Sequence, residues 1–233
     1  MAFPSLATEA SSNWQARALR RSLDQVRGRS LDRMTLMVAA ARDLANETGG
    51  AAFTVIQVAQ RAGFSLKVFY RYFASKDELL LALIEEDSRM GADLLVEQLV
   101  GISDPVERLR SYVEGLFGLL THPGAVGYAG VLVREYRRLS ESNPDELRVA
   151  LAPIAGLLVD QLAAAVEAGL ARVDDAPRAA ETVFVVLLNG INDVTAGRAE
   201  PKELATWLWQ FCWSGLGGTP DVDHVDNQEG EKS

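Results

Sequence analysis

Residues 54–76 read TVIQVAQRAGFSLKVFYRYFASK, and this stretch decides the expected fold. Its apolar spacing predicts two short helices, residues 55–62 and 66–73, joined by a turn at Gly63. Glycine adopts the positive φ of a sharp turn at little cost, and the small Ala59 lets the two helices cross closely. We therefore expect a helix-turn-helix whose inner side chains pack on a preceding helix: Val55, Val58, Ala62, Phe64, Phe69 and Tyr72.

The outward positions of the second short helix carry residue types that DNA-reading helices use. Basic side chains reach phosphates or guanine edges, apolar ones contact thymine methyl groups, and hydroxyls suit the DNA backbone. A helix N-terminus is itself suited to a phosphate oxygen. The positions expected to contact DNA are Thr54, Ser65, Leu66, Lys67, Val68, Tyr70, Arg71, Tyr72 and Lys76. Two alternatives stay open: Lys67 and Arg71 as plain solvated cations, and Tyr72 as a core residue.

The net charge of −9 over 233 residues argues at first against a nucleic-acid partner, because proteins that bind nucleic acid are usually basic. The charge is unevenly distributed, however. Residues 1–76 carry 11 basic and five acidic side chains, a net +6, whereas residues 77–233 carry 12 and 27, a net −15. No acidic residue occurs between Gly49 and Lys76. This asymmetry favours a nucleic-acid-binding face on the N-terminal part and argues against one on the acidic remainder.

Composition and motifs exclude several other classes of protein. The single cysteine, Cys212, rules out an internal disulfide, and with only His122 and His224 the chain cannot supply a structural zinc tetrad. The longest wholly apolar run, residues 183–188, is far shorter than the ~20 residues of a membrane span, and no apolar run of signal-peptide length lies near the start. No nucleotide-binding, hydrolase or metalloprotease motif is present. We expect a cytoplasmic protein without cofactor, metal, membrane partner or catalytic activity.

The rest of the sequence predicts one helix after another, without an alternating strand pattern of useful length. Residues 1–29 are expected to form a flexible basic arm, and residues 217–233 a disordered acidic tail. Ser30 should cap the first long helix and Ser75 the fourth helix. A later helix is expected to bend or break at Pro153, and other prolines should mark helix starts: Pro105, Pro144, Pro177 and Pro201. The predicted fold is all-α, with about nine helices.

The segment around Gly63 resembles the DNA-binding domain of the TetR family of bacterial repressors, whose hallmark runs FT…VAxxAGVS…YxYFxSKxxLL. The matching residues are Phe53, Thr54, Val58, Ala59, Ala62, Gly63, Ser65, Tyr70, Tyr72, Phe73, Ser75, Lys76, Asp77, Leu79 and Leu80. The close match covers about residues 31–85, and the remainder is similar in length and helix count. Two departures occur: Phe64 replaces a smaller aliphatic residue, and Lys67-Val68 stands where Gly/Ala-Thr is common, so the base preference is not implied.

The resemblance implies two domains, a three-helix DNA-binding domain over residues 30–76 and a helical ligand-binding and dimerisation domain over residues 77–216. It implies a small-molecule cavity lined by the fifth to eighth helices, for which the candidates are Leu116, Phe117, Leu120, Tyr128, Val131, Leu132, Phe184 and Asn189. It also implies a dimer built from the last two helices, through Val185, Leu188, Asn192, Trp207 and Phe211. Large aromatic residues on two sides of the ninth helix agree with burial on both.

Purely structural roles for these C-terminal residues stay open. The cavity candidates also suit an ordinary core, and the ninth helix could be the centre of a monomer. Asn189, Asn192 and Asp193 could hydrogen-bond a ligand or one another across a dimer. Arg134, Arg137 and Arg138 share a helical face that could hold an anionic group or simply be solvated.

The sequence thus leads to the expectation of a ligand-responsive transcriptional regulator, most simply a repressor. A homodimer would bind a palindromic double-stranded DNA operator and be released by a mostly apolar small molecule. The alternatives are a DNA-binding regulator without a small-molecule effector and a helical enzyme or binding protein. The last alternative would have to explain the acid-free stretch of residues 49–76.

Overall fold

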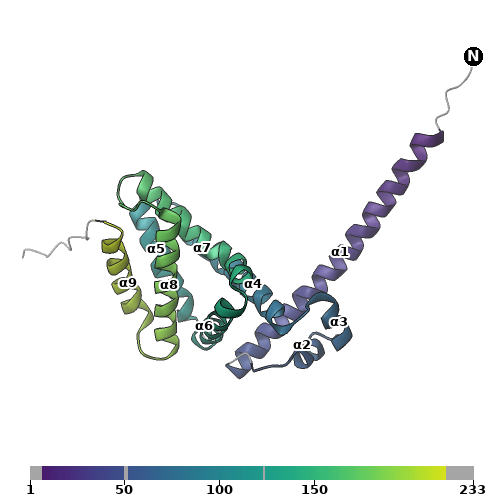
Figure 1. The fold of residues 1–233 in the computed structure, drawn as a ribbon, viewed down its shortest axis with the longest axis horizontal. Coiled ribbons are helices and arrows are strands. Elements are labelled where there is room, and N and C mark those ends of the chain that lie inside the picture. Colours follow the sequence, from purple (N-terminus) through teal and green to yellow (C-terminus); the bar gives the residue numbers. More distant parts are fainter. Residues whose placement is uncertain (1–6, 50–51, 123, 219–233) are drawn as a thin grey trace, which may run out of the picture. The chain divides into compact units, whose positions relative to one another are not determined.

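The computed structural model describes residues 7–49, 52–122 and 124–218. Within these ranges the chain is all-α, as predicted, and no strand occurs (Figure 1). The elements are α1 (Ala7–Thr48), α2 (Val55–Arg61), α3 (Leu66–Tyr72), α4 (Lys76–Leu99), α5 (Pro105–Gly118), a short 3-10 helix (Leu119–Thr121), α6 (Ala125–Ser142), α7 (Pro144–Glu167), α8 (Ala176–Thr195) and α9 (Pro201–Gly215).

The chain divides into two compact units. The N-terminal unit contains α1, α2, α3 and the start of α4 as far as Leu83, and the C-terminal unit contains the chain from Ile84 onward. The division therefore falls inside α4, later than the boundary predicted after Lys76, because α4 is one continuous helix. Apart from Gly217 and Gly218, the predicted acidic tail lies outside the described residues.

The prediction that the first helix begins after Ser30 is wrong. Helix α1 begins at Ala7 and takes in most of the expected arm, so Ser30 lies inside the helix and does not cap it. The physical reason is local: residues 7–27 contain neither proline nor glycine and are rich in Ala, Leu, Gln and Arg, which favour helix. Residues 1–6 of the predicted arm lie outside the described residues.

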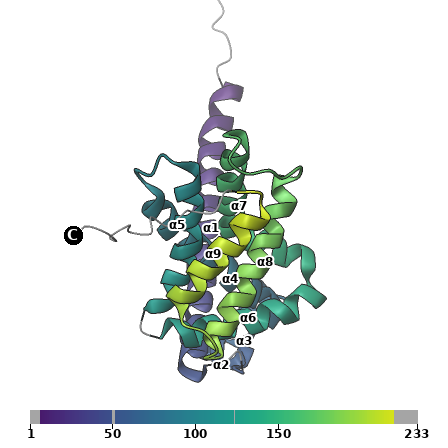
Figure 2. The same cartoon turned by 90° about the vertical axis from the view of Figure 1, so that its left-hand side faces the viewer.

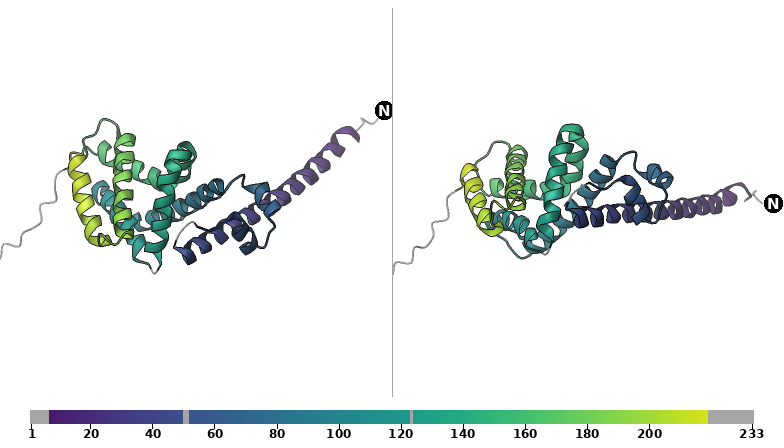
Figure 3. Two further views of the ribbon diagram at one scale, coloured as in Figure 1. Left: turned by 60° about the horizontal axis from the view of Figure 1, so that its bottom comes forward. Right: turned by 90° about the horizontal axis from the view of Figure 1, so that it is seen from below.

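The N-terminal unit is held together by small and apolar side chains on its three helices. Helix α2 lies against the C-terminal half of α1, and α3 packs on α2 (Figure 3). Ala59 and Val58 of α2 and Phe69 of α3 are almost completely buried, as the spacing predicted. Gly63 has a φ of 77°, in the left-handed region that favours glycine, and so makes the sharp turn between the two helices. The buried positions that α1 contributes are Met37, Val38, Ala40, Ala41, Leu44 and Ala45.

The C-terminal unit packs α5, α6, α7, α8 and α9 around a single apolar core. Helix α5 packs on α7 and α9, and α8 packs on α6, α7 and α9. Figure 2 shows α8 and α9 side by side. The two helices approach closely at Gly190, where a Cβ atom would lie 2.6 Å from Leu208 Cδ1. The wholly buried centre of the core includes Tyr112, Phe117, Leu158, Leu162 and Leu187.

Helix α7 continues through Pro153 and is not interrupted there. It is also the one helix of the described residues that is long and apolar enough to cross a membrane by length and composition. A core helix passes the same test, and α7 packs on α5, α6 and α8. The residues of α7 that are buried in this way are Leu147, Ala150, Ile154, Leu158, Gln161, Leu162 and Ala165.

Candidate nucleic-acid interface and effector cavity

Helix α3 presents one face to solvent and the other to the core of the N-terminal unit. Its N-cap is Ser65, whose Oγ accepts a hydrogen bond from the backbone N–H of Val68 at 3.4 Å. Phe69 points inward and is wholly buried, and Val68 is half-buried. Of the predicted DNA-contacting set, Thr54 at the start of α2 is exposed, and so are five residues at the start of and within α3: Ser65, Leu66, Lys67, Tyr70 and Arg71. These five side chains form the outward face of α3.

Lys67 and Arg71 are the two basic residues of this face. Within the described part of the chain, neither Lys67 nor Arg71 forms an ion pair, and both are exposed. Arg61 of α2 differs, because its guanidinium donates to both carboxylate oxygens of Glu47 at 2.7 and 2.8 Å. That hydrogen bond lowers the pKa of Glu47 and raises the pKa of Arg61. Arg61 is therefore tied to α1, whereas Lys67 and Arg71 can meet phosphates or base edges.

The other predicted DNA contacts have structural partners within the N-terminal unit. Tyr72 is half-buried, and its hydroxyl accepts a hydrogen bond from Arg33 Nη1 of α1 at 3.4 Å. Hydrogen bonds from Ser30 and then Arg33 lower the pKa of Tyr72. Sequence reasoning missed Arg33, whose guanidinium also lies 5.9 Å from the centre of the Phe64 ring. Tyr72 therefore links α3 to α1. It also lies at the border of the exposed face of α3.

Thr54 and Lys76 also take part in local structure. The Thr54 backbone N–H donates to Gln57 Oε1 at 2.7 Å, and Gln57 N–H donates to Thr54 Oγ1 at 3.3 Å, which makes a capping box at the start of α2. The Lys76 Nζ lies 4.6 Å from the centre of the Phe53 ring. Both residues stay candidates for contacts with phosphates.

A cavity of about 300 Å³ lies in the C-terminal unit between α4, α5, α6, α7 and α8. Five of the eight predicted cavity residues line it: Leu116, Leu120, Tyr128, Leu132 and Phe184. Phe117 and Val131 are buried elsewhere in the core, and Asn189 is exposed and accepts a hydrogen bond from Arg137 at 3.3 Å. The lining is almost wholly apolar, and its polar side chains are Asp87, Ser88, Tyr128 and Tyr136.

Helix α4 supplies cavity residues that sequence reasoning missed. Ile84, Asp87, Ser88 and Gly91 all line the cavity. Their spacing (i, i+3, i+4 and i+7) puts them on one face of a helix, and this pattern could have been recognised in the sequence. Asp87 is half-buried and accepts a hydrogen bond from the Tyr128 hydroxyl. Ser88 is buried, and its Oγ accepts from the backbone N–H of Ile154 at 3.2 Å.

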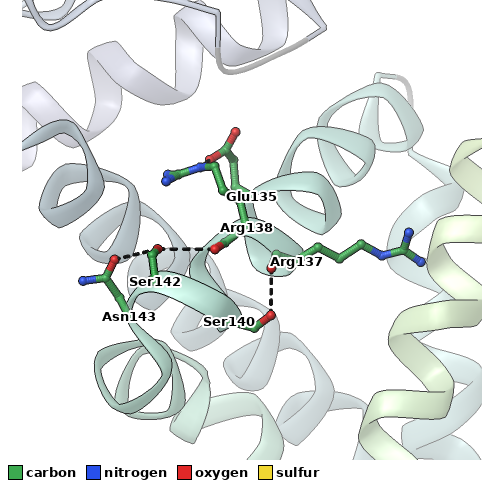
Figure 4. Close-up of polar contacts among 6 residues, drawn as sticks. All are labelled: Glu135, Arg137, Arg138, Ser140, Ser142 and Asn143. Atoms are coloured by element: carbon green, nitrogen blue, oxygen red, sulfur yellow. Dashed lines mark hydrogen bonds and ion pairs between the residues drawn. The ribbon is translucent and has the colours of Figure 1, made fainter.

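The arginines of α6 lie on the surface and do not line this cavity. Arg138 donates to Glu135 at 2.9 Å, and Figure 4 shows the two side chains on the same side of α6. The Ser140 hydroxyl donates to the Arg137 carbonyl at 2.8 Å, and Ser142 donates to the Arg138 carbonyl at 3.3 Å (Figure 4). All three arginines are exposed and each donates a hydrogen bond to a neighbour: Arg134 to the Gly49 carbonyl at 2.7 Å, Arg137 to Asn189 and Arg138 to Glu135.

The α8–α9 surface is unusually aromatic. Trp207 and Phe211 are 57% and 58% exposed, and their rings stack with centroids 5.3 Å apart. Trp209 and Trp213, on the opposite side of α9, stack in the same way but are buried. A shallow hollow of about 740 Å³ lies between the exposed aromatic rings and α8. Of the other predicted interface residues, Val185 is exposed, Asn192 is half-buried and Leu188 is half-buried and lines the cavity.

No cluster of three or more possible metal ligands occurs among residues 7–49, 52–122 and 124–218. Asp193, one of the polar residues of α8, pairs with Arg198 at 2.6 Å.

Comparison with known proteins finds a match to a family model in the N-terminal part of the chain. Residues 37–83 match the family model described as bacterial regulatory proteins, tetR family, which confirms the resemblance drawn from the helix-turn-helix. The chain is 31% identical over 78 residues to the HTH-type transcriptional regulator HbdR of Aromatoleum sp. strain CIB, covering 34% of each protein. It is 30% identical over 105 residues to the HTH-type transcriptional activator FasR of Mycolicibacterium smegmatis, covering 45% of this chain and 48% of FasR. The matched region thus spans less than half of either relative.

Solved structures have a similar fold over about four fifths of this chain. RolR in complex with resorcinol superposes with a TM-score of 0.64 at 18% identity, covering 82% of this chain and 91% of RolR. FadR of Bacillus subtilis in complex with stearoyl-CoA superposes with a TM-score of 0.64 at 19% identity, covering 78% of this chain and 98% of FadR. At these identities the likeness concerns the fold.

Proposed function

We propose that this TetR-family chain is a DNA-binding transcriptional regulator that acts in the cytoplasm as a homodimer and responds to a small molecule. The observation that carries the proposal is the outward face of α3. It presents Lys67 and Arg71, exposed and without an ion pair among the described residues, inside a stretch without acidic residues. Such a face suits phosphates and guanine edges, and Leu66 beside it suits thymine methyl groups.

The α8–α9 surface supports a homodimer. Trp207 and Phe211 place two large aromatic rings in water, a costly arrangement for a helix whose opposite side is already buried. A second copy of the same surface would cover both rings and the hollow beside them. A two-fold dimer presents two α3 helices, and such dimers bind palindromic sites whose halves lie about one helical turn apart.

The cavity supports a small-molecule effector. Its volume of about 300 Å³ and its apolar lining with few polar groups are typical of ligand sites. Helix α4 contributes Ser88 to the cavity and begins at Lys76, directly after the reading helix. A ligand that binds one arrangement of α4 better than another would shift the population of DNA-binding dimers. The neighbouring structures with resorcinol and stearoyl-CoA show that this fold accommodates very different ligands.

The simplest mode of regulation is repression that the effector relieves. FasR, a partial relative, is named as an activator, and activation is therefore the second candidate. A reporter gene placed behind the bound DNA distinguishes the two modes. Deleting the regulator raises reporter expression under repression and lowers it under activation.

The experiment that tests the proposal is a binding titration with DNA that flanks the protein's own gene. We expect binding that saturates at one dimer per site and weakens steeply with added salt, because phosphate contacts release counterions. Scrambled DNA of equal length is the control, and equal affinity for both DNAs would contradict a specific operator. Absence of salt-dependent binding to either DNA would overturn the proposal altogether.

A further inference from the structure

A second hollow lies beside the effector cavity and shares three lining side chains with it. This hollow, which we call the α7 groove, has a volume of about 390 Å³ and is lined by residues of α6, α7 and α8. Tyr136 of α6, Leu151 of α7 and Phe184 of α8 line both the groove and the cavity of about 300 Å³. One side chain from each of the three helices therefore contributes to a wall between the two spaces.

The cavity and the groove follow one another along the same helices. On α6 the cavity positions lie within residues 125–136, and the groove positions within residues 136–140. On α8 the order is reversed, with cavity positions within residues 184–191 and groove positions within residues 180–185. The groove thus continues the cavity along α6 and α8, and the wall stands where the two spaces meet.

The wall is part of the packed interior of the C-terminal unit. Phe184 is buried within the apolar core, and Leu151 is half-buried and packs against that core. Side chains packed in this way do not move aside without leaving a void or straining their rotamers. The cavity opens to water instead along α4, where its lining residues Met90 and Leu94 are exposed. A ligand too long for the cavity would therefore extend into water and not into the groove.

We propose that Tyr136, Leu151 and Phe184 limit the length of the effector, so that the cavity selects compact apolar molecules of about twelve non-hydrogen atoms. This inference rests on the proposed effector role of the cavity and specifies the size of its ligand. The size follows from volume, because a cavity of about 150 Å³ holds one benzene ring and this cavity is about twice as large. Carbon atoms beyond that limit gain little affinity, because they stay in water.

The test uses straight-chain 1-alkanols from 1-hexanol to 1-tetradecanol. Equilibrium dialysis of the full-length protein with radiolabelled alcohols gives the affinity of each probe. We expect binding to strengthen by about fourfold for each methylene that the cavity buries, as far as about ten to twelve carbons. Beyond about twelve carbons we expect the wild-type affinity to level off, with less than about a threefold gain between 1-dodecanol and 1-tetradecanol.

Variants of the wall join the two spaces. Phe184→Ala removes the largest buried side chain of the wall, and the affinity should then rise at least about tenfold between 1-dodecanol and 1-tetradecanol. Leu151→Ala opens the same wall at a half-buried position and provides the test if Phe184→Ala does not fold. The matched control is Leu147→Ala, because Leu147 is buried and lines the groove but not the cavity. It should keep the wild-type length limit, and circular dichroism checks that each variant folds.

The inference is overturned if the wild-type affinity keeps rising about fourfold per methylene up to fourteen carbons, if a folded wall variant keeps the wild-type limit, or if none of the alcohols binds. It is also overturned if Leu147→Ala extends the limit as far as the wall variants do. Failure of the proposed function would appear in a separate measurement, as the absence of salt-dependent DNA binding by the ligand-free wild-type protein. The two failures can therefore be told apart.

Discussion

Ser88 of α4 accepts a hydrogen bond from the backbone N–H of Ile154 in α7, with the nitrogen 3.2 Å from Oγ, and both residues are buried. The Tyr112 hydroxyl of α5 donates to the carbonyl of the same residue, Ile154, at 2.9 Å. Ile154 directly follows Pro153, which has no N–H and cannot complete the regular helical ladder. Polar side chains from α4 and α5 therefore hold α7 at its weak point, beside the cavity that Ser88 and Ile154 both line.

Replacing Ser88 by Ala should lower the free energy of unfolding by about 1 kcal/mol, because it removes the buried hydrogen bond from the Ile154 N–H to Ser88 Oγ. Urea unfolding followed by circular dichroism measures the change. The matched control is Ser140→Ala in α6, where the hydroxyl is exposed and bonds only within its own helix. We expect the control to stay within about 0.5 kcal/mol of wild type. Equal losses in both variants would remove the special role given to Ser88.

Tyr112 gives the unfolding free energy a pH dependence of known sign. Burial raises the pKa of its phenol well above the ordinary value near 10. Above about pH 10 the unfolded chain releases this proton while the folded protein keeps it, so stability present below pH 10 is lost as the pH rises. The wild-type free energy of unfolding should fall by up to about 1.4 kcal/mol per pH unit more than that of Tyr112→Phe. If the free energy of unfolding of wild type and of Tyr112→Phe changed equally with pH above pH 10, the result would contradict this account.

Replacing Gly63 by Ala should destabilise the protein, whereas replacing Gly127 by Ala should stabilise it. A Cβ atom would meet nothing within 4 Å at either position, so only backbone conformation differs. Gly63→Ala forces alanine to a φ of 77° and should cost about 1–2 kcal/mol, with weaker DNA binding as a consequence. Gly127→Ala lies within α6 and should stabilise the protein by up to about 1 kcal/mol. Denaturant unfolding measures both, and the account fails here if the two changes share a sign.

Phe211→Glu should convert the dimer to a monomer, because it places a charge in the centre of the proposed α8–α9 interface. Sedimentation velocity measures the oligomeric state. Val149→Glu, which adds the same charge at an exposed apolar position of α7, is the control and should remain dimeric. Identical sedimentation of wild type and Phe211→Glu as dimers would mean that the subunits associate through another surface.

The features that local chemistry determines could be predicted from sequence. Thr54 and Ser65 cap α2 and α3 as expected, and Gly63 makes the turn, because each role depends on residues only a few positions away. The exposed face of α3 followed from helical periodicity in the same way. The prolines at the starts of α5, α7 and α9 were also recognised for this reason.

The features that depend on tertiary contacts could not be predicted. Of the two outcomes expected at Pro153, a bend or an interruption, the interruption does not occur: α7 continues, with Ile154 held by Ser88 and Tyr112, which are distant in sequence. Asp87 was missed as a cavity residue because it follows Glu85 and Glu86, and a run of acidic residues in an amphipathic helix usually faces solvent. The helical residues before Ser30 were missed because polar composition suggested an irregular arm although helix propensity there is high.

The central claim is that the exposed face of α3 binds DNA, and a titration of the double variant Lys67→Ala/Arg71→Ala tests it most directly. Fluorescence anisotropy with labelled DNA flanking the protein's own gene should give saturable, salt-dependent binding for wild type. The double variant should remain folded and dimeric, lose at least about tenfold in affinity, and show a smaller salt dependence because two cations are gone. An unchanged affinity and salt dependence in a folded double variant would contradict the account.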